Sequence, residues 1–66
     1  VKIRLNGEAR DVAEGTTVAA LLATLGLPKD GVAVALNHHV VPRGEHAATV
    51  LAEGAVVEVI RAVGGG

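Results

Sequence analysis

The chain has 66 residues, of which 50% are hydrophobic and none is aromatic, and its formal net charge at pH 7 is −1. This length allows a single domain, and the absence of cysteine excludes disulfides and thiolate metal sites, so aliphatic packing must hold the fold. The small net charge and the lack of aromatic side chains argue against nucleic-acid binding, and no apolar run approaches the ~20 residues of a membrane span.

The first twelve residues predict a β-hairpin. Apolar and basic residues alternate over residues 1–5, which is the pattern of a strand with one buried face. Asn6-Gly7 follows, and this dipeptide favours a type I′ turn, which needs a positive φ at both central positions. Residues 8–12 return as an antiparallel strand, and their charges favour a place at the sheet edge because they discourage pairing with other chains.

The next segment predicts an amphipathic helix. Its apolar stripe has the spacing i, i+3, i+4 and i+7 and consists of Val18, Leu21, Leu22 and Leu25. Thr16 is the expected N-cap, with Thr17 as the alternative. Gly26 stands where helices end on a glycine, and Leu27-Pro28 then supply an apolar Schellman-type contact and a stop.

The second half of the chain predicts two further strands joined by a turn. Residues 32–36 alternate larger apolar side chains with alanines, and the small side chains suggest that another group approaches this face closely. The turn is expected at residues 37–39. Residues 40–41 then form a short strand that Pro42 ends, since proline tolerates only an edge or a strand end.

The remaining elements complete the predicted fold. Residues 46–51 are expected to form one helical turn that closes the core through Val50 and Leu51, and residues 56–60 form the most apolar strand, which favours the sheet interior. This order predicts an α+β protein of the β-grasp, or ubiquitin-like, class: a mixed sheet of about five strands with one main helix on one face. The first and last strands should run parallel in the middle, and the helix should cross right-handedly.

The glycines at the end of the sequence are the strongest functional signal. We expect residues 1–63 to form the domain and Gly64, Gly65 and Gly66 to form a flexible tail, with a free α-carboxylate on Gly66. Glycine packs nothing and loses backbone entropy on ordering, so a structural element would not favour this ending. A peptide without Cβ atoms can lie between the close walls of an active site and present its carboxylate. A frayed terminus is the alternative interpretation.

This strand order with a terminal diglycine resembles the ThiS family, the ubiquitin-like sulfur carriers of thiamine biosynthesis. The resemblance covers most of the chain, and it is carried by Asn6-Gly7, Gly15-Thr16-Thr17-Val18, Leu21-Leu22, Val34-Ala35-Leu36-Asn37, Val41-Pro42-Arg43, Leu51, Glu53-Gly54 and Gly65-Gly66. The sequence departs from the family pattern at Ala55, where an acidic residue is common, at His46, where an aromatic is common, and at the additional Gly64.

The resemblance implies a carrier protein with no catalytic residue and no bound cofactor. A ubiquitin-activating-type enzyme would use ATP to adenylate the Gly66 carboxylate, and sulfur from a cysteine desulfurase or another donor would displace AMP. The resulting thiocarboxylate would be delivered to thiazole synthase. Such a carrier acts as a protein-sized co-substrate, because binding energy far from the reacting centre can position its tail. No signal peptide opens the sequence, so we expect a cytoplasmic location.

An apolar patch beside charges is the expected docking surface. Ile60 and Val63 would form the patch, since exposed apolar patches rimmed by polar residues suit transient partners. Lys2 and Arg4 are expected on the same open face of the sheet, where they could pair with Glu58 across the central strands.

The other charged and ionisable residues allow two interpretations each. Arg43 is either a solvated loop cation or a contact to an acidic partner surface. Histidines 38, 39 and 46 are expected as exposed turn residues rather than as metal ligands, because adjacent side chains in an extended chain point to opposite sides and no cysteine joins them.

Three alternatives to the thiamine carrier remain open from the sequence. A molybdopterin-synthase sulfur carrier would use the same terminus with a different acceptor enzyme. A protein-conjugated ubiquitin-like modifier would end with Gly66 in an isopeptide bond. An interaction module would have an inert tail.

Overall fold

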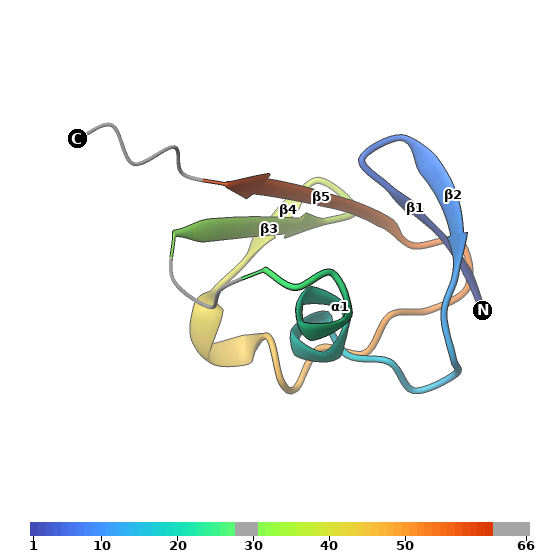
Figure 1. Ribbon diagram of the computed structural model, residues 1–66, viewed down its shortest axis with the longest axis horizontal. Helices are drawn as coiled ribbons and strands as arrows, with labels where there is room; N and C mark the ends of the chain where they lie inside the picture. The colour runs from blue at the N-terminus through green and yellow to red at the C-terminus, as the bar shows by residue number, and fades with distance from the viewer. Residues whose placement is uncertain (28–30, 62–66) are drawn as a thin grey trace.

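The computed structural model describes residues 1–27 and 31–61. Its elements are β1 (Lys2–Leu5), β2 (Glu8–Asp11), α1 (Val18–Thr24), β3 (Val32–Leu36), β4 (His39–Val41), the 3₁₀ helix η1 (Arg43–Glu45) and β5 (Val56–Arg61). The strands form one five-stranded sheet in the order β2-β1-β5-β3-β4, and α1 covers one face of it (Figure 1). This arrangement confirms the predicted β-grasp fold.

The last strand, β5, is the centre of the sheet. It runs parallel to β1 over a short stretch, with Arg4 opposite Val56 and Leu5 opposite Val57. It runs antiparallel to β3 over a longer stretch, from the pair Leu36–Val57 to the pair Val32–Arg61. The first and last strands therefore lie side by side in the middle, as predicted, and the edge position of the charged strand β2 is also confirmed.

Both hairpins close with tight turns whose two central residues have positive φ. The first turn has φ values of 50° at Asn6 and 85° at Gly7, and the second has 51° at Asn37 and 71° at His38. These values fit type I′ turns, as predicted for Asn6-Gly7. The second turn is shorter than predicted, because His39 already belongs to β4. His38 adopts a left-handed conformation that costs an L-residue about 1 kcal/mol.

The start of α1 corrects one prediction. Thr17, not Thr16, is the N-cap, and its side-chain oxygen accepts a hydrogen bond from the Ala20 N–H at 3.1 Å. The Thr16 hydroxyl instead donates to the Ala13 carbonyl at 2.7 Å. The two adjacent threonines thus have different roles. Thr16 closes the preceding turn, and Thr17 satisfies a free amide of the first helical turn.

The end of α1 has the predicted glycine motif. Gly26 has a φ of 72°, which favours glycine. Its N–H donates to the Ala23 carbonyl at 3.1 Å, and the Leu27 N–H donates to the Leu22 carbonyl at 3.0 Å. These two bonds make a complete Schellman motif. Pro28, the predicted stop, lies outside the described residues.

An aliphatic core fills the space between α1 and the sheet. Its buried members are Ile3, Leu5, Val18, Leu21, Leu22, Val34, Leu51, Ala55 and Val57. Every strand of the sheet interior contributes to this list, and so does the segment that precedes β5. A core of such small side chains depends on close interdigitation, since no aromatic ring is present to fill larger gaps.

The segment before β5 differs from the predicted helical turn at residues 46–51. The helical turn lies earlier, in η1, and residues 49–51 are held by main-chain bonds to the start of α1 instead. The Val18 N–H donates to the Thr49 carbonyl at 2.9 Å, and the Leu51 N–H donates to the Thr16 carbonyl at 2.8 Å. Leu51 closes the core as predicted, whereas Val50 is 55% exposed.

Replacing Thr17 with alanine tests the observed cap. Loss of the side-chain acceptor is expected to lower the free energy of unfolding by about 1 kcal/mol, measured by urea denaturation. Thr17→Ser keeps the hydroxyl and is the matched control. Equal stability of the alanine and serine variants would contradict the assignment of this cap.

Candidate functional site

The predicted reactive end lies outside the described residues. This applies to Gly64, Gly65 and Gly66, and also to Val63, so the predicted domain boundary at residue 63 lies there too. The last described residue, Arg61, is the end of β5. The described residues therefore show the folded domain up to the end of β5, after which the chain continues to Gly66.

The face of the sheet opposite α1 carries an apolar surface. Side chains alternate between the faces of a strand, so the buried Val34 and Val57 fix their sequence neighbours on the open side. We define the open-face patch as Ala33, Ala35, Val40 and Ile60. The register sets Ala33 opposite Ile60 and Ala35 opposite Val40. No helix covers this side of the sheet in the part of the chain that Figure 1 shows in colour.

The open-face patch has the properties of a docking surface. Ile60 is 65% exposed and Val40 is 75% exposed. Together with Val50 they are the exposed large hydrophobic side chains within residues 1–27 and 31–61. Two of these three therefore lie on the open face, with Ile60 next to the end of β5 and Val40 on the edge strand β4, level with Glu58. Exposed apolar side chains that share one face are typical of an interaction site.

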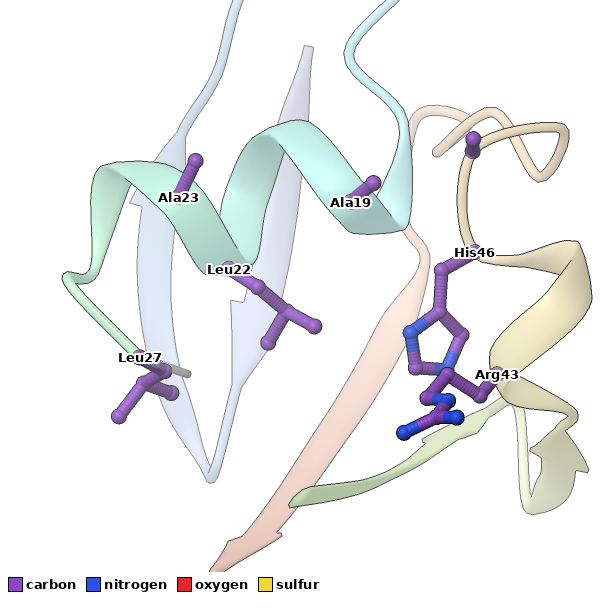
Figure 2. Close-up of a pocket in the computed structure, with 7 residues that line it drawn as sticks. Ala19, Leu22, Ala23, Leu27, Arg43 and His46 are labelled. Atoms are coloured by element: carbon purple, nitrogen blue, oxygen red, sulfur yellow. The ribbon is translucent and has the colours of Figure 1, made fainter. Parts of the chain in front are cut away.

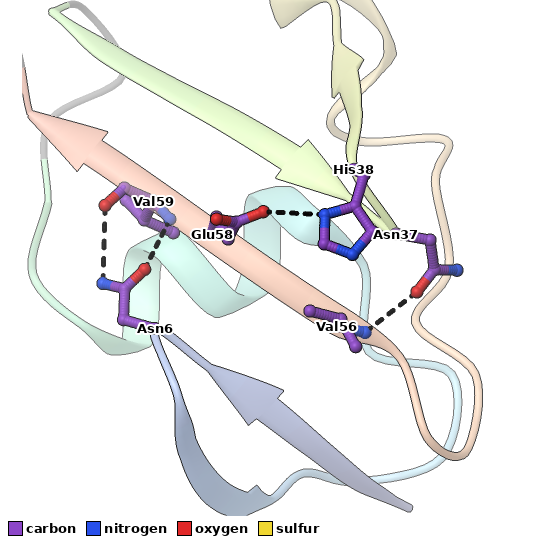
Figure 3. A network of polar contacts seen from close by, with 6 residues as sticks. All are labelled: Asn6, Asn37, His38, Val56, Glu58 and Val59. Carbon is purple, nitrogen blue, oxygen red and sulfur yellow. Dashed lines mark hydrogen bonds and ion pairs between the residues drawn. The ribbon is translucent and has the colours of Figure 1, made fainter.

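The predicted charge pairing on this face is wrong. Glu58 lies 3.6 Å from His38, between Oε1 and Nδ1 (Figure 3). Arg4 instead donates from Nη1 to the Gly7 carbonyl at 3.0 Å. The register explains the difference, because Arg4 lies opposite Val56 and the paired part of β1 ends before Glu58. Both members of the observed pair are exposed, so it adds little stability.

Two turn asparagines contact the backbone of β5 (Figure 3). Asn6 accepts at Oδ1 from the Val59 N–H at 2.9 Å and donates from Nδ2 to the Val59 carbonyl at 3.4 Å. Asn37 accepts at Oδ1 from the Val56 N–H at 3.0 Å, and its own N–H donates to the Val56 carbonyl at 2.7 Å. Sequence reasoning assigned both residues to turns and missed these contacts.

A hollow lies on the helix side of the molecule (Figure 2). Its volume is about 480 Å³, and α1 lines it with Ala19, Leu22 and Ala23 while Arg43 and His46 form the opposite wall. Arg43 is thus on the helix side of the sheet, whereas Ile60 is on the open face. The structure does not bring these two predicted docking residues together on one surface.

His46 is not the exposed turn residue that was predicted. It is only 6% exposed, and its Nε2 lies 3.0 Å from the Val41 carbonyl oxygen. A carbonyl only accepts, so this bond requires the proton to be on Nε2. The His46 carbonyl in turn accepts from the Ala19 N–H at 3.0 Å. His46 therefore joins β4 to the start of α1, and its ring occupies a position that suits a flat side chain.

The described residues hold neither a metal-binding cluster nor a membrane-spanning helix. Residues 1–27 and 31–61 contain no group of three or more His, Asp or Glu side chains placed to hold a metal ion. Within the same residues, α1 and η1 are both too short to cross a membrane.

Comparison with known proteins decides the family. The ThiS family model matches residues 3–66. The chain belongs to the ThiS family. The resemblance inferred from the sequence is thereby confirmed, and the match includes the terminal glycines that the described residues leave out.

Solved structures of ThiS proteins agree with this assignment. The thiamine biosynthesis protein ThiS from Geobacter metallireducens has 33% sequence identity to this chain. Its crystal structure superposes with a TM-score of 0.84, and the match covers 100% of both chains. The solution structure of a thiamine biosynthesis protein from the same organism gives a TM-score of 0.81, with 88% of that chain covered.

Two curated relatives carry a different name. The thiazole synthases of Magnetococcus marinus and Paramagnetospirillum magneticum are 46% and 36% identical to this chain over all 66 residues. The chain spans only 20% of the length of each of these relatives. A region similar to this ThiS-family chain is therefore part of a much longer polypeptide in both of them.

His46 variants test whether its ring is a structural link. His46→Ala removes both the ring and the bond to Val41, and it is expected to lower the free energy of unfolding by about 2–4 kcal/mol. His46→Phe keeps a flat ring and loses only the bond, so about 1 kcal/mol is expected. Urea denaturation measures both values. A phenylalanine variant less stable than the alanine variant would contradict this packing role.

Proposed function

We propose that this ThiS-family chain is a sulfur carrier of thiamine biosynthesis and that Gly66 is the residue that carries the sulfur. The observation that carries the proposal is the family match, which extends from residue 3 to Gly66. The fold supports it, because β5 leads directly from the centre of the sheet toward the glycines.

The proposed chemistry follows from the weakness of a carboxylate as an acyl donor. An activating enzyme of the ubiquitin-activating type joins the Gly66 carboxylate to the α-phosphate of ATP and releases pyrophosphate. A sulfur nucleophile supplied by a cysteine desulfurase or another donor then attacks the acyl carbon. A C–S bond forms, the C–O bond to the phosphate breaks, and AMP leaves. With sulfide as the nucleophile the product is a thiocarboxylate. With a persulfide the product is an acyl disulfide, and a thiol then cleaves its S–S bond, forms a disulfide with the donor sulfur and releases the thiocarboxylate. The carrier itself acts as a co-substrate rather than as a catalyst.

We infer that thiazole synthase accepts the sulfur. The two relatives named thiazole synthase contain a region similar to this whole chain within one longer polypeptide. Proteins that work together are found joined in this way, so the arrangement favours thiazole synthase over molybdopterin synthase as the acceptor. In this proposal ATP belongs to the activating enzyme, the carrier holds no cofactor of its own, and the location is the cytoplasm.

Intact-mass spectrometry tests the reaction. Incubation with the activating enzyme, ATP and the sulfur donor is expected to exchange one oxygen for one sulfur at Gly66. Deletion of Gly66 is expected to abolish the exchange, because the reacting carboxylate is then displaced by one residue. The spectrum of protein isolated from its own cells also measures whether Gly66 is the last residue, as the proposal requires.

Three results would contradict this proposal in different ways. An unchanged mass with all components present indicates an inert terminus. Attachment to the lysines of other proteins indicates a protein modifier. Sulfur transfer to molybdopterin synthase, but not to thiazole synthase, indicates the other carrier pathway.

We further propose that the open-face patch docks on the activating enzyme. Ile60 lies next to Arg61, the end of β5, so a partner seated on this face would also be near the continuing chain. Ile60→Thr keeps β-branching while it removes apolar surface, and it is expected to lower kcat/KM for adenylation about fivefold, the effect of about 1 kcal/mol at an interface.

Val50→Thr is the matched control for the patch. Val50 is also an exposed hydrophobic side chain, but it lies outside the open face, so no change in adenylation is expected. Equal losses in the Ile60 and Val50 variants would contradict docking on the open face. Arg43→Ala tests separately whether the helix side contacts an acidic partner surface.

A further inference from the structure

The side chain of Asn6 contacts β5 just beyond the point where the backbone pairing between β1 and β5 ends. The last backbone bond on this side is from the Asn6 N–H to the Val57 carbonyl, at 2.9 Å. The chain then reverses at Asn6-Gly7. The Asn6 carboxamide extends further along β5 and pairs with both the N–H and the carbonyl of Val59 (Figure 3). It therefore supplies the acceptor and the donor that a longer β1 main chain would have offered to Val59.

This contact lies at the end of β5 from which the chain continues. On the β3 side, backbone pairing supports β5 as far as Arg61, opposite Val32. On the β1 side, strand pairing ends at Val57. Asn6 carries the support on that side to Val59, two residues before the end of the strand.

The turn alone does not explain the choice of asparagine. Position 6 needs a φ of 50°, which glycine and aspartate also adopt. Of these three residues, only asparagine offers both an acceptor and a donor, on separate atoms, which is what pairing with a backbone N–H and carbonyl requires. The side chain is thus matched to β5 as well as to the turn.

We propose that Asn6 is a positioning residue that fixes the direction in which β5 delivers the chain beyond Arg61 to the active site of the activating enzyme. This rests on the proposed function of Gly66. Reactions that depend on the placement of a reacting group lose rate steeply when that group is displaced. A β5 end held on one side only would deliver the carboxylate over a wider range of directions.

Asn37 provides the matched control within the same strand. It occupies the equivalent place in the other hairpin turn, with a φ of 51°, and its Oδ1 accepts from the Val56 N–H at 3.0 Å. Val56 is the first residue of β5, at the end remote from Arg61. Asn6→Gly and Asn37→Gly therefore each remove a side-chain acceptor of a β5 amide, at opposite ends of one strand, and both positions tolerate glycine. Asn6→Gly also removes the longer bond to the Val59 carbonyl.

Hydrogen exchange tests the local part of the proposal without any partner. After correction for global stability, Asn6→Gly is expected to speed exchange of the Val59 amide roughly three- to tenfold, the effect of losing one such bond. Asn37→Gly is expected to speed exchange of the Val56 amide and to leave exchange of the Val59 amide unchanged. Asn6→Asp keeps the acceptor and is expected to restore protection. Unchanged Val59 exchange in Asn6→Gly would overturn the proposal.

Adenylation kinetics test the functional part. Asn6→Gly is expected to lower kcat about three- to tenfold with little change in KM, because the open-face patch is intact. Asn37→Gly should behave as wild type, and Asn6→Asp should recover most of kcat. Equal kcat values for the two glycine variants would overturn the positioning role. Absence of adenylation in the wild-type protein would instead overturn the proposed function, and the positioning role with it.

Discussion

The pairing of β5 on both of its edges is the interaction on which the rest of the molecule depends. This strand has β1 on one side and β3 on the other, and each flanking hairpin adds an asparagine contact from its turn. The alternation of its side chains gives it two roles at once. Val57 faces α1 and is fully buried, whereas Ile60 is exposed on the open face. Core packing and the proposed docking surface are therefore consequences of one register, and a shift by one residue would exchange them.

The two faces of the sheet differ in role, because one forms the core and the other is exposed. The side under α1 is closed by aliphatic side chains and by His46, whose bond to the Val41 carbonyl ties β4 to the helix layer. The open side has small or exposed apolar residues and a contact between the exposed side chains of His38 and Glu58 that contributes little stability. A protein whose binding surface is separate from its core can change that surface without loss of fold. This separation suits the sulfur carrier proposed above, which would meet an activating enzyme and an acceptor enzyme in turn.

Local patterns allowed most of the fold to be predicted from the sequence. The apolar stripe of α1, the Schellman end at Gly26 and the turn at Asn6-Gly7 each depend on a few consecutive residues, and each is confirmed. Two errors are shifts of one residue within a local pattern, at the Thr17 cap and at His39, whereas the larger errors concern contacts between distant segments. The segment at residues 49–51 pairs with the start of α1, which no local pattern reveals, and the burial of His46 likewise depends on packing. The partner of Glu58 was predicted wrongly because the sequence does not reveal the register between β1 and β5. The part played by Gly66 stays a prediction, since that residue lies outside the described ones.

The position of β5 in the chain also constrains how the protein is made. The sheet centre comes from residues 56–61, yet its parallel neighbour β1 comes from the first residues of the sequence. Bringing such distant segments together costs more chain entropy than closing a local turn, and non-local pairing of this kind slows folding. During synthesis, a nascent chain that stops before β5 has no closed sheet and no glycine end. The hairpins β1–β2 and β3–β4 can therefore join into one sheet only when β5 has been made, since it is the strand that lies between them.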